Sequence, residues 1–173
     1  MLAGSSSDYK NIVNSAKIAL PDGIGVMIAG KVMGKQLKQR IQGVDFVRSL
    51  CRAVEEKPIT VGFLGAGPRI AEQTAECLKR KYPGLKVTFA SSEFPATAGS
   101  RIYGDKIQPF GAAQGKSSGS HNYEPITKIP ATDILFVAFG SPKQEIWIYE
   151  NLGKLPVKIA IGVGGAFDFL SGN

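Results

Sequence analysis

Apolar residues in this chain fall into two kinds of run, short continuous ones and longer periodic ones. The nearly continuous apolar run over residues 133–139 predicts a strand buried on both faces, and further strands are predicted over residues 59–64, 85–90 and 157–161. The periodic or helix-favouring stretches predict helices, and they cover residues 8–16, 23–34, 44–56, 68–82 and 142–151. An alternating order of strands and helices favours a parallel sheet with right-handed crossovers. The sequence therefore predicts one Rossmann-like α/β domain with a mainly parallel sheet and helices on both faces.

Three stretches fit this order less simply. Residues 17–20 predict a further short strand that ends at Pro21. The helix expected over residues 23–34 is rich in glycine, which usually means close packing against a neighbouring element. Residues 91–130 are rich in glycine, serine and proline without a sustained period, so they predict a flexible insertion.

Composition narrows the class of protein. A net charge of +7 favours acidic partners such as phosphorylated substrates or an anionic membrane surface, whereas no aromatic-rich RNA-binding signature accompanies the dispersed basic residues. Nucleic acid is therefore not an expected partner. The N-terminus lacks the pattern of a secretory signal and no apolar run reaches the roughly 20 residues that span a bilayer, so a cytoplasmic domain is expected.

The cysteines and the histidine offer little chemistry. Cys51 and Cys77 lack the spacing of a metal or redox motif and are expected to be reduced thiols in helices. His121 is the only histidine and lies in a Ser/Gly-rich stretch, which argues against a Ser-His-Asp triad. No DxD pair occurs, so a metal-chelating sugar-nucleotide site of that kind is not expected.

Glycine-rich junctions follow the expected strands, at the edge where open α/β sheets bind ligands. Gly140 and Ser141 follow residues 133–139, with Lys143 and Gln144 at the start of the next helix. A second junction follows residues 157–161. It contains Gly162, Gly164, Gly165 and Asp168, and its backbone N–H groups either cradle a diphosphate or form a turn that only needs positive φ angles.

The junction after residues 59–64 contains Gly65 and Gly67, as in the first half of a dinucleotide fingerprint. Ile70 occupies the position of the third glycine, and Glu93 lies near the place of a ribose-binding acid. Either a tight turn with a general nucleotide contact or the NAD site of an oxidoreductase domain fits this pattern.

Asp22 lies between the short strand expected over residues 17–20 and the next helix, with glycines beside it that let a substrate approach the backbone. It is the best candidate for a catalytic carboxylate. The alternative is a helix N-cap, because aspartate is a preferred residue there. The spacing does not decide between these two roles.

Several segments together are specific enough to indicate a family. They are LPDGIGV at 20–26, the R-x-x-G-V-D element at 40–45, FLGAGP at 63–68, the K-YPGL segment at 81–85, DILFVAFGSPKQEIW at 133–147 and AIGVGGAFDFLSG at 160–172. In this order they resemble the WecG/TagA/CpsF family of bacterial glycosyltransferases. The resemblance implies transfer of N-acetylmannosamine or a related sugar from a UDP-sugar to undecaprenyl-diphosphate-linked N-acetylglucosamine, in the synthesis of wall teichoic acid or a related polymer. It further implies inversion at the anomeric carbon, no metal or other cofactor, and a peripheral location at the inner face of the membrane.

The resemblance also implies roles for single residues. Asp22 would act as general base on the acceptor hydroxyl. Backbone N–H groups of residues 140–144 and 162–165, with the cations of Lys143 and Arg40, would meet the charge of the leaving UDP. Gln144 would hydrogen-bond sugar or phosphate, and Asp168 would hold a donor hydroxyl.

Against the family pattern the chain looks shortened. The family has a further strand upstream and continues into a basic, membrane-docking tail that contributes arginines, whereas this chain ends at Asn173. We therefore expect residues 1–173 to form the glycosyltransferase core with little activity in isolation. A truncated binding module without activity is a further alternative, and exposed apolar surface would favour a homo-oligomer.

Overall fold

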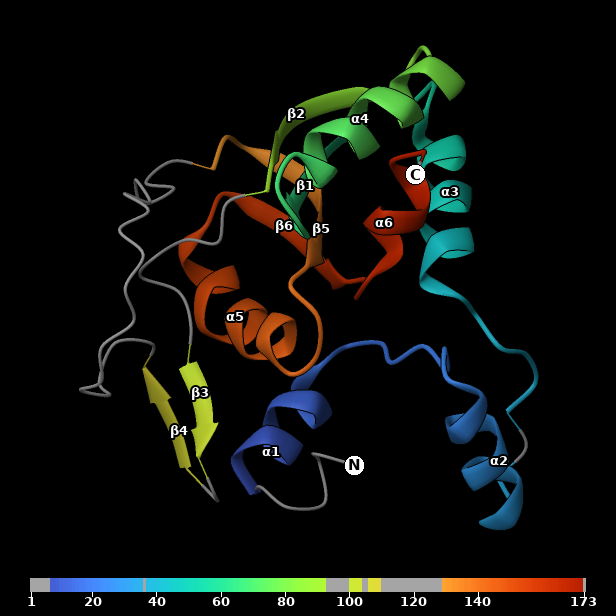
Figure 1. Cartoon of the computed structure of the whole chain (residues 1–173), viewed down its shortest axis with the longest axis vertical. Helices are drawn as coiled ribbons and strands as arrows, with labels where there is room; N and C mark the ends of the chain where they lie inside the picture. The colour runs from blue at the N-terminus through green and yellow to red at the C-terminus, as the bar shows by residue number, and fades with distance from the viewer. Residues whose placement is uncertain (1–6, 36, 93–99, 104–105, 110–128, 173) are drawn as a thin grey trace.

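A parallel sheet of four strands forms the centre of the protein (Figure 1). The computed structural model describes residues 7–35, 37–92, 100–103, 106–109 and 129–172. The strand order is β2-β1-β5-β6 and every pair in this sheet is parallel. The strands are β1 (Thr60–Gly65), β2 (Lys86–Ser91), β5 (Thr132–Ala138) and β6 (Val157–Gly162). The predicted α/β fold class and the order of its strands along the chain are thereby confirmed.

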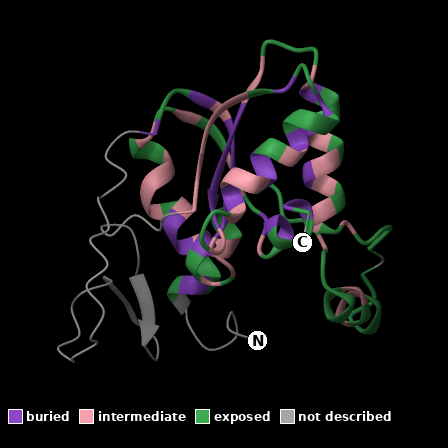
Figure 2. Cartoon of the chain, turned by 45° about the horizontal axis from the view of Figure 1, so that its top comes forward, coloured by how far each residue is buried: buried purple, intermediate pink, exposed green. Residues whose placement is uncertain are grey.

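Helices cover both faces of the sheet. One face is covered by α3 (Gly43–Val54), α4 (Ile70–Lys81) and the short α6 (Ala166–Leu170), and the other by α5 (Lys143–Asn151). The alternation along the strands explains this arrangement: Phe136 faces the α3–α4–α6 layer, whereas its neighbours Leu135 and Val137 face α5. A 3-10 turn, Leu152–Lys154, follows α5, and α1 (Ser7–Ser15) packs on α5 through Tyr9, Ile12 and Ile146. Figure 2 shows buried residues concentrated in the strands and on the inner sides of these helices.

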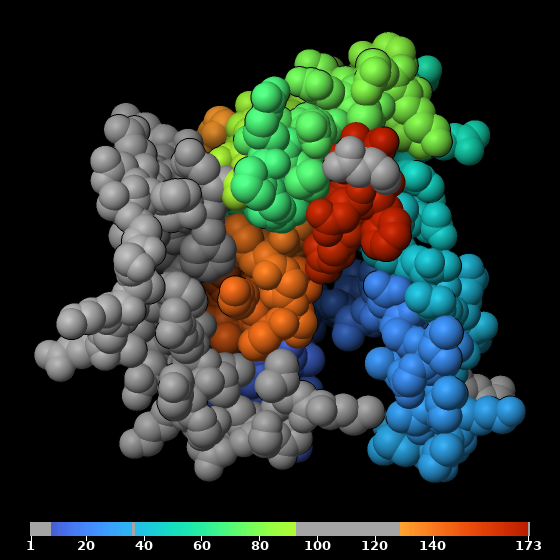
Figure 3. Space-filling model, viewed as in Figure 1, coloured from blue at the N-terminus to red at the C-terminus, as the bar shows by residue number. Residues whose placement is uncertain are grey.

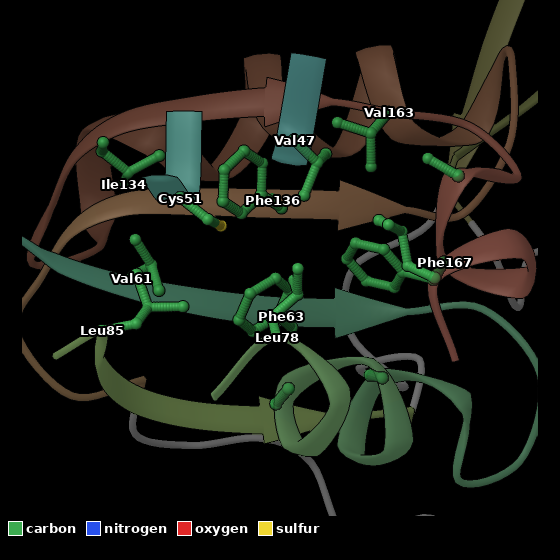
Figure 4. Packing of buried hydrophobic residues seen from close by; sticks show 14 of the residues in the cluster. Val47, Cys51, Val61, Phe63, Leu78, Leu85, Ile134, Phe136, Val163 and Phe167 are labelled. Atoms are coloured by element: carbon green, nitrogen blue, oxygen red, sulfur yellow. The ribbon is translucent and has the colours of Figure 1, made fainter. Parts of the chain in front are cut away.

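An aromatic cluster fills the core between β1, β5 and α6 (Figure 4). The ring of Phe63 stacks on Phe136 at 5.5 Å between centroids and meets Phe167 edge-on at 5.6 Å. Cys51 of α3 is fully buried beside them, and burial raises the pKa of its thiol to about 12. Cys51 is therefore a neutral packing residue, and both cysteines are free, as predicted.

The amino edge of the sheet is fixed by Asp133. Its Oδ2 accepts hydrogen bonds from the backbone N–H of Thr60 at 2.8 Å and from the Thr60 hydroxyl at 2.9 Å, and its Oδ1 lies 2.6 Å from Nζ of Lys158. The ion pair and these hydrogen bonds lower the pKa of Asp133 to about 2. Since one carboxylate joins β1, β5 and β6 here, this edge is structural.

One sequence prediction was wrong. Residues 17–20 form no strand and are exposed. The helix α2 (Ile24–Val32) exists, but none of its described side chains is buried, and a Cβ placed on Gly25 would meet nothing within 4 Å. At Gly30, by contrast, an added Cβ would come within 3.0 Å of the Leu37 side chain, so this glycine does pack closely against the segment that follows the helix.

Residues 91–130 were predicted to be a flexible insertion. They contain the antiparallel pair β3 (Ser100–Tyr103) and β4 (Lys106–Pro109). The flexibility expected of this insertion stays a prediction, because residues 93–99, 104–105 and 110–128 lie outside the described part of the chain.

Candidate functional site

Three loops with unusual backbone angles meet at the carboxyl edge of the sheet. Gly65 (φ +103°), Gly140 (φ +74°) and Gly164 (φ +56°) have positive φ angles at the ends of β1, β5 and β6, where glycine is favoured. The loops are tied to β5, because Ala66 N–H donates to the carbonyl of Ala138 and Val163 N–H to that of Val137, both at 2.9 Å. The predicted glycine junctions therefore lie on neighbouring strand ends.

Gln144 links two of these loops. Its Oε1 accepts the Gly164 N–H at 2.9 Å and its Nε2 donates to Oε1 of Glu145 at 2.9 Å, with only 7% of the residue exposed. The side chain lies on Gly162, where an added Cβ would come within 3.0 Å of the Gln144 amide. Both ends of this amide are thus engaged within the protein. The predicted contact of Gln144 with sugar or phosphate stays a prediction, and the Gly164 N–H expected in the diphosphate cradle is already occupied.

Asp22 lies beside the loop between β6 and α6. Its Oδ2 accepts the N–H of Gly43 at 3.3 Å, and Gly43 touches that loop so closely that an added Cβ would come within 3.1 Å of the Val163 carbonyl. Gly43 is the first residue of α3, so Asp22 caps α3 rather than the helix that follows it. The cap is partial, because 57% of the side chain is exposed and open to a substrate.

Arg40 lies next to Asp22, as a shared site requires. A terminal nitrogen of its guanidinium is 3.7 Å from Oδ1 of Asp22, and its Nε donates to the Asp22 backbone carbonyl. An exposed pair of this kind contributes little to stability. The pair matters for the chemistry of the site, since the guanidinium of Arg40 is available to bind phosphate oxygens beside the exposed carboxylate.

The other predicted site residues line the same edge. The hydroxyl of Ser141 forms a hydrogen bond of 2.9 Å with the hydroxyl of Tyr9. Burial raises the pKa of Tyr9, with a smaller contribution from the charge of Glu145. Lys143 is exposed at the first position of α5, and Asp168 is exposed in α6.

The loop after β1 does not favour a dinucleotide. An added Cβ on Gly65 would come within 2.7 Å of the Phe139 ring, so this glycine serves packing. At the start of α4, Ala71 N–H donates to Ser92 Oγ at 3.1 Å, and the Glu72 carboxylate accepts from Ser92 N–H at 3.0 Å and its hydroxyl at 2.6 Å. Burial raises the pKa of Glu72, but these hydrogen bonds outweigh it and the net shift is downward. The Ala71 N–H is thus already bonded, and the Glu72 carboxylate beside it is negatively charged. Neither group favours binding of a pyrophosphate here. Glu93 lies outside the described residues, and nucleotide contacts by Gly65 and Gly67 stay predictions.

Gly43, Tyr9, Ser92 and Glu72 were missed by sequence reasoning. Gly43 had a signal, since it lies within the R-x-x-G-V-D element. The roles of the other three depend on contacts between distant segments, which no local pattern announces. In the described part of the chain, His, Cys, Asp and Glu side chains form no group of three or more that could hold a metal ion.

Comparison with known proteins identifies the family. The sequence profile of the family described as Glycosyl transferase WecG/TagA/CpsF matches residues 1–173. The chain belongs to this family. The resemblance drawn from the motifs is confirmed, and the matched range includes every candidate site residue named above.

Curated members of the WecG/TagA/CpsF family also match. A protein of Bacillus spizizenii is 34% identical over 165 residues, 95% of this chain and 56% of that protein. Proteins of Bacillus subtilis and Staphylococcus aureus are 28% and 24% identical over 96% and 95% of this chain. All three are named N-acetylglucosaminyldiphosphoundecaprenol N-acetyl-beta-D-mannosaminyltransferase. The chain spans a little over half the length of these relatives, 56% of each.

Proposed function

We propose that this chain forms the core of a glycosyltransferase that moves N-acetylmannosamine, or a related sugar, from a UDP-sugar to undecaprenyl-diphosphate-linked N-acetylglucosamine. The reaction inverts the anomeric carbon and uses no metal. Membership of the family and the names of the relatives support the reaction class and the acceptor. The single observation that carries the proposal is the exposed Asp22 carboxylate beside the glycine loop of β6.

In the proposed step Asp22 takes the proton of the acceptor hydroxyl while that oxygen bonds to the anomeric carbon. The bond from this carbon to the UDP oxygen breaks at the same time, and UDP leaves with the electron pair. Arg40 and Lys143 supply positive charge near the leaving diphosphate, and the loop after β5 supplies backbone N–H groups. The exposure of Asp22 supports this role because the acceptor must reach its oxygens directly.

The first test separates nucleotide classes by thermal unfolding. UDP is expected to raise Tm, by mass action on the folded state, and NAD is expected to leave it unchanged. A rise with NAD alone would support the oxidoreductase alternative instead. The capped start of α4 is the structural reason to expect no NAD effect.

The second test measures release of UDP from a UDP-sugar with a short-chain lipid-diphosphate sugar acceptor. Asp22→Asn keeps an acceptor oxygen for the Gly43 N–H, so Tm should not change, whereas the rate should fall by about 10²–10⁴ if a general base is lost. Asp45→Asn is the matched control, since Asp45 is also an exposed acid near the start of α3. Release near the wild-type rate by Asp22→Asn removes the residue from this role. Because little activity is expected of residues 1–173 alone, the assay uses a high protein concentration, and a wild-type chain that neither binds UDP nor releases it overturns the proposal.

A further inference from the structure

The chain leaves the body of the protein at Asp22 and returns to it at Arg40, and we call this segment the α2 excursion. Its ends are held together, because Ile41 N–H donates to the carbonyl of Pro21 at 3.0 Å and Arg40 donates to that of Asp22. Figure 1 places α2 away from the sheet and its covering helices, and in Figure 3 the blue segment stands apart from the orange and red body. The excursion is thus a closed loop that projects into solvent.

Its surface is apolar. Val32 is 81% exposed, Met33 72% and Ile28 59%, and Ile24 and Val26 are also exposed. A helix that is apolar on all sides is normally buried, so a partner is expected to cover this one.

The charges of the excursion have one dominant sign. Lys31, Lys35 and Lys38 are exposed along it. Asp22 is its only acid, and lies at the base beside Arg40. The partner should therefore combine negative charge with an apolar interior. A second copy fits poorly, since it carries the same +7 charge and the same lysines.

We propose that the α2 excursion docks the protein onto an anionic lipid bilayer. The apolar side chains enter the interface, and the lysines lie among the negatively charged headgroups. The helix has nine residues, and no helix in the described ranges is long and apolar enough to cross a membrane. The excursion therefore lies on the bilayer rather than spanning it.

Docking of the α2 excursion concerns the same site as the proposed function, and its biological role rests on that function. Because α2 begins two residues after Asp22, docking brings that carboxylate to the headgroup layer, where the diphosphate of a lipid-linked acceptor lies. The binding itself requires no acceptor, so it is testable separately from catalysis.

The test is co-sedimentation of the chain with vesicles. One set is phosphatidylcholine alone, and in the other about 30 mol% of the lipid is phosphatidylglycerol, which is anionic. Binding is expected with the anionic vesicles and should weaken as salt is raised. Ile28→Ser with Met33→Ser should abolish it, and Lys31→Gln with Lys35→Gln should weaken it by about fivefold per lysine. Every variant is also checked for an unchanged Tm.

Matched controls change the same chemistry elsewhere. Lys57→Gln with Lys79→Gln gives the same net charge from exposed positions outside the excursion, and Tyr149→Ser removes an exposed apolar side chain of α5. Both controls should bind like the wild type. Equal binding by the excursion variants and the controls would overturn the proposal. So would absence of vesicle binding, or a dimer in sedimentation equilibrium that Ile28→Ser with Met33→Ser dissolves. Asp22→Asn should bind vesicles fully, so failed catalysis and failed docking remain distinguishable.

Discussion

Replacing Gln144 by alanine removes the side chain that joins the loops after β5 and β6. The Gly164 N–H loses its acceptor, which costs about 1–3 kcal/mol, and one buried methylene adds about 0.8 kcal/mol. Together these give about 3 kcal/mol of lost stability. For a domain of this size, that corresponds to a fall in Tm of about 6–12 °C. Thermal unfolding followed by circular dichroism measures it.

Gln144→Glu sharpens the test. The carboxylate still accepts the Gly164 N–H, but its second oxygen faces Oε1 of Glu145, where Nε2 donated before. Repulsion raises the carboxyl pKa values of this pair in the folded state. Folding then favours the protonated form, so the stability lost relative to wild type should be smallest below about pH 4 and should grow as pH rises.

The double variant Gln144→Glu with Glu145→Gln reverses donor and acceptor and restores the hydrogen bond. It should recover most of the stability lost by Gln144→Glu at pH 7. An unchanged Tm for Gln144→Ala, or a double variant no more stable than Gln144→Glu, would refute the argument that this amide holds the two loops together.

Three further predictions concern stability. Gly162→Ala places a Cβ within 3.0 Å of the Gln144 amide and should cost about 1–3 kcal/mol in urea unfolding, because the amide cannot move without losing its partners. Phe63→Ala empties a fully buried position in the aromatic cluster and should cost about 3–5 kcal/mol in the same assay. Asp133→Asn should be less stable than wild type at pH 7. Because the pKa of Asp133 is lowered to about 2 beside Lys158, its contribution is present above about pH 4 and disappears towards pH 2, where the two Tm values should converge.

The hydrophobic pattern predicted the fold well because burial dictates it directly. The run over residues 133–139 is apolar at consecutive positions, and β5 is covered by helices on both faces, as such a run requires. The sequence predictions failed where the local sequence pattern does not match burial in the folded protein. Residues 17–20 are apolar enough for a strand but find no neighbouring strand to pair with. The glycines of α2 suggested packing against a neighbouring element, yet none of the described side chains of the helix is buried.

The sequence predicted that the candidate site residues lie at one edge of the sheet, but not how they are connected, and their roles stay predictions. The glycine motifs located three loops at one edge, since parallel strands point their carboxyl ends the same way. Which side chain joins which loop depends on distances across the fold. Gln144 bonds to a residue 20 positions away and Asp22 to one 21 positions away. The sequence left Asp22 open between a catalytic carboxylate and an N-cap of the next helix; the N-cap residue of that helix is Gly23, and Asp22 accepts an N–H of α3 instead.

The two edges of the sheet are stabilised in different ways, and this difference explains where chemistry is possible. At the amino edge the Asp133 carboxylate is bonded to Thr60 and Lys158, so its oxygens are occupied by the fold. At the carboxyl edge the loops with positive φ are held by a few backbone hydrogen bonds to β5 and by the side chain of Gln144. Beside them, among the described residues, the Asp22 carboxylate contacts the Gly43 N–H and the guanidinium of Arg40, and 57% of its side chain is exposed. The exposed carboxylate of Asp22 is therefore the one proposed as the base, whereas the oxygens of Asp133, with its lowered pKa, are already engaged by the fold.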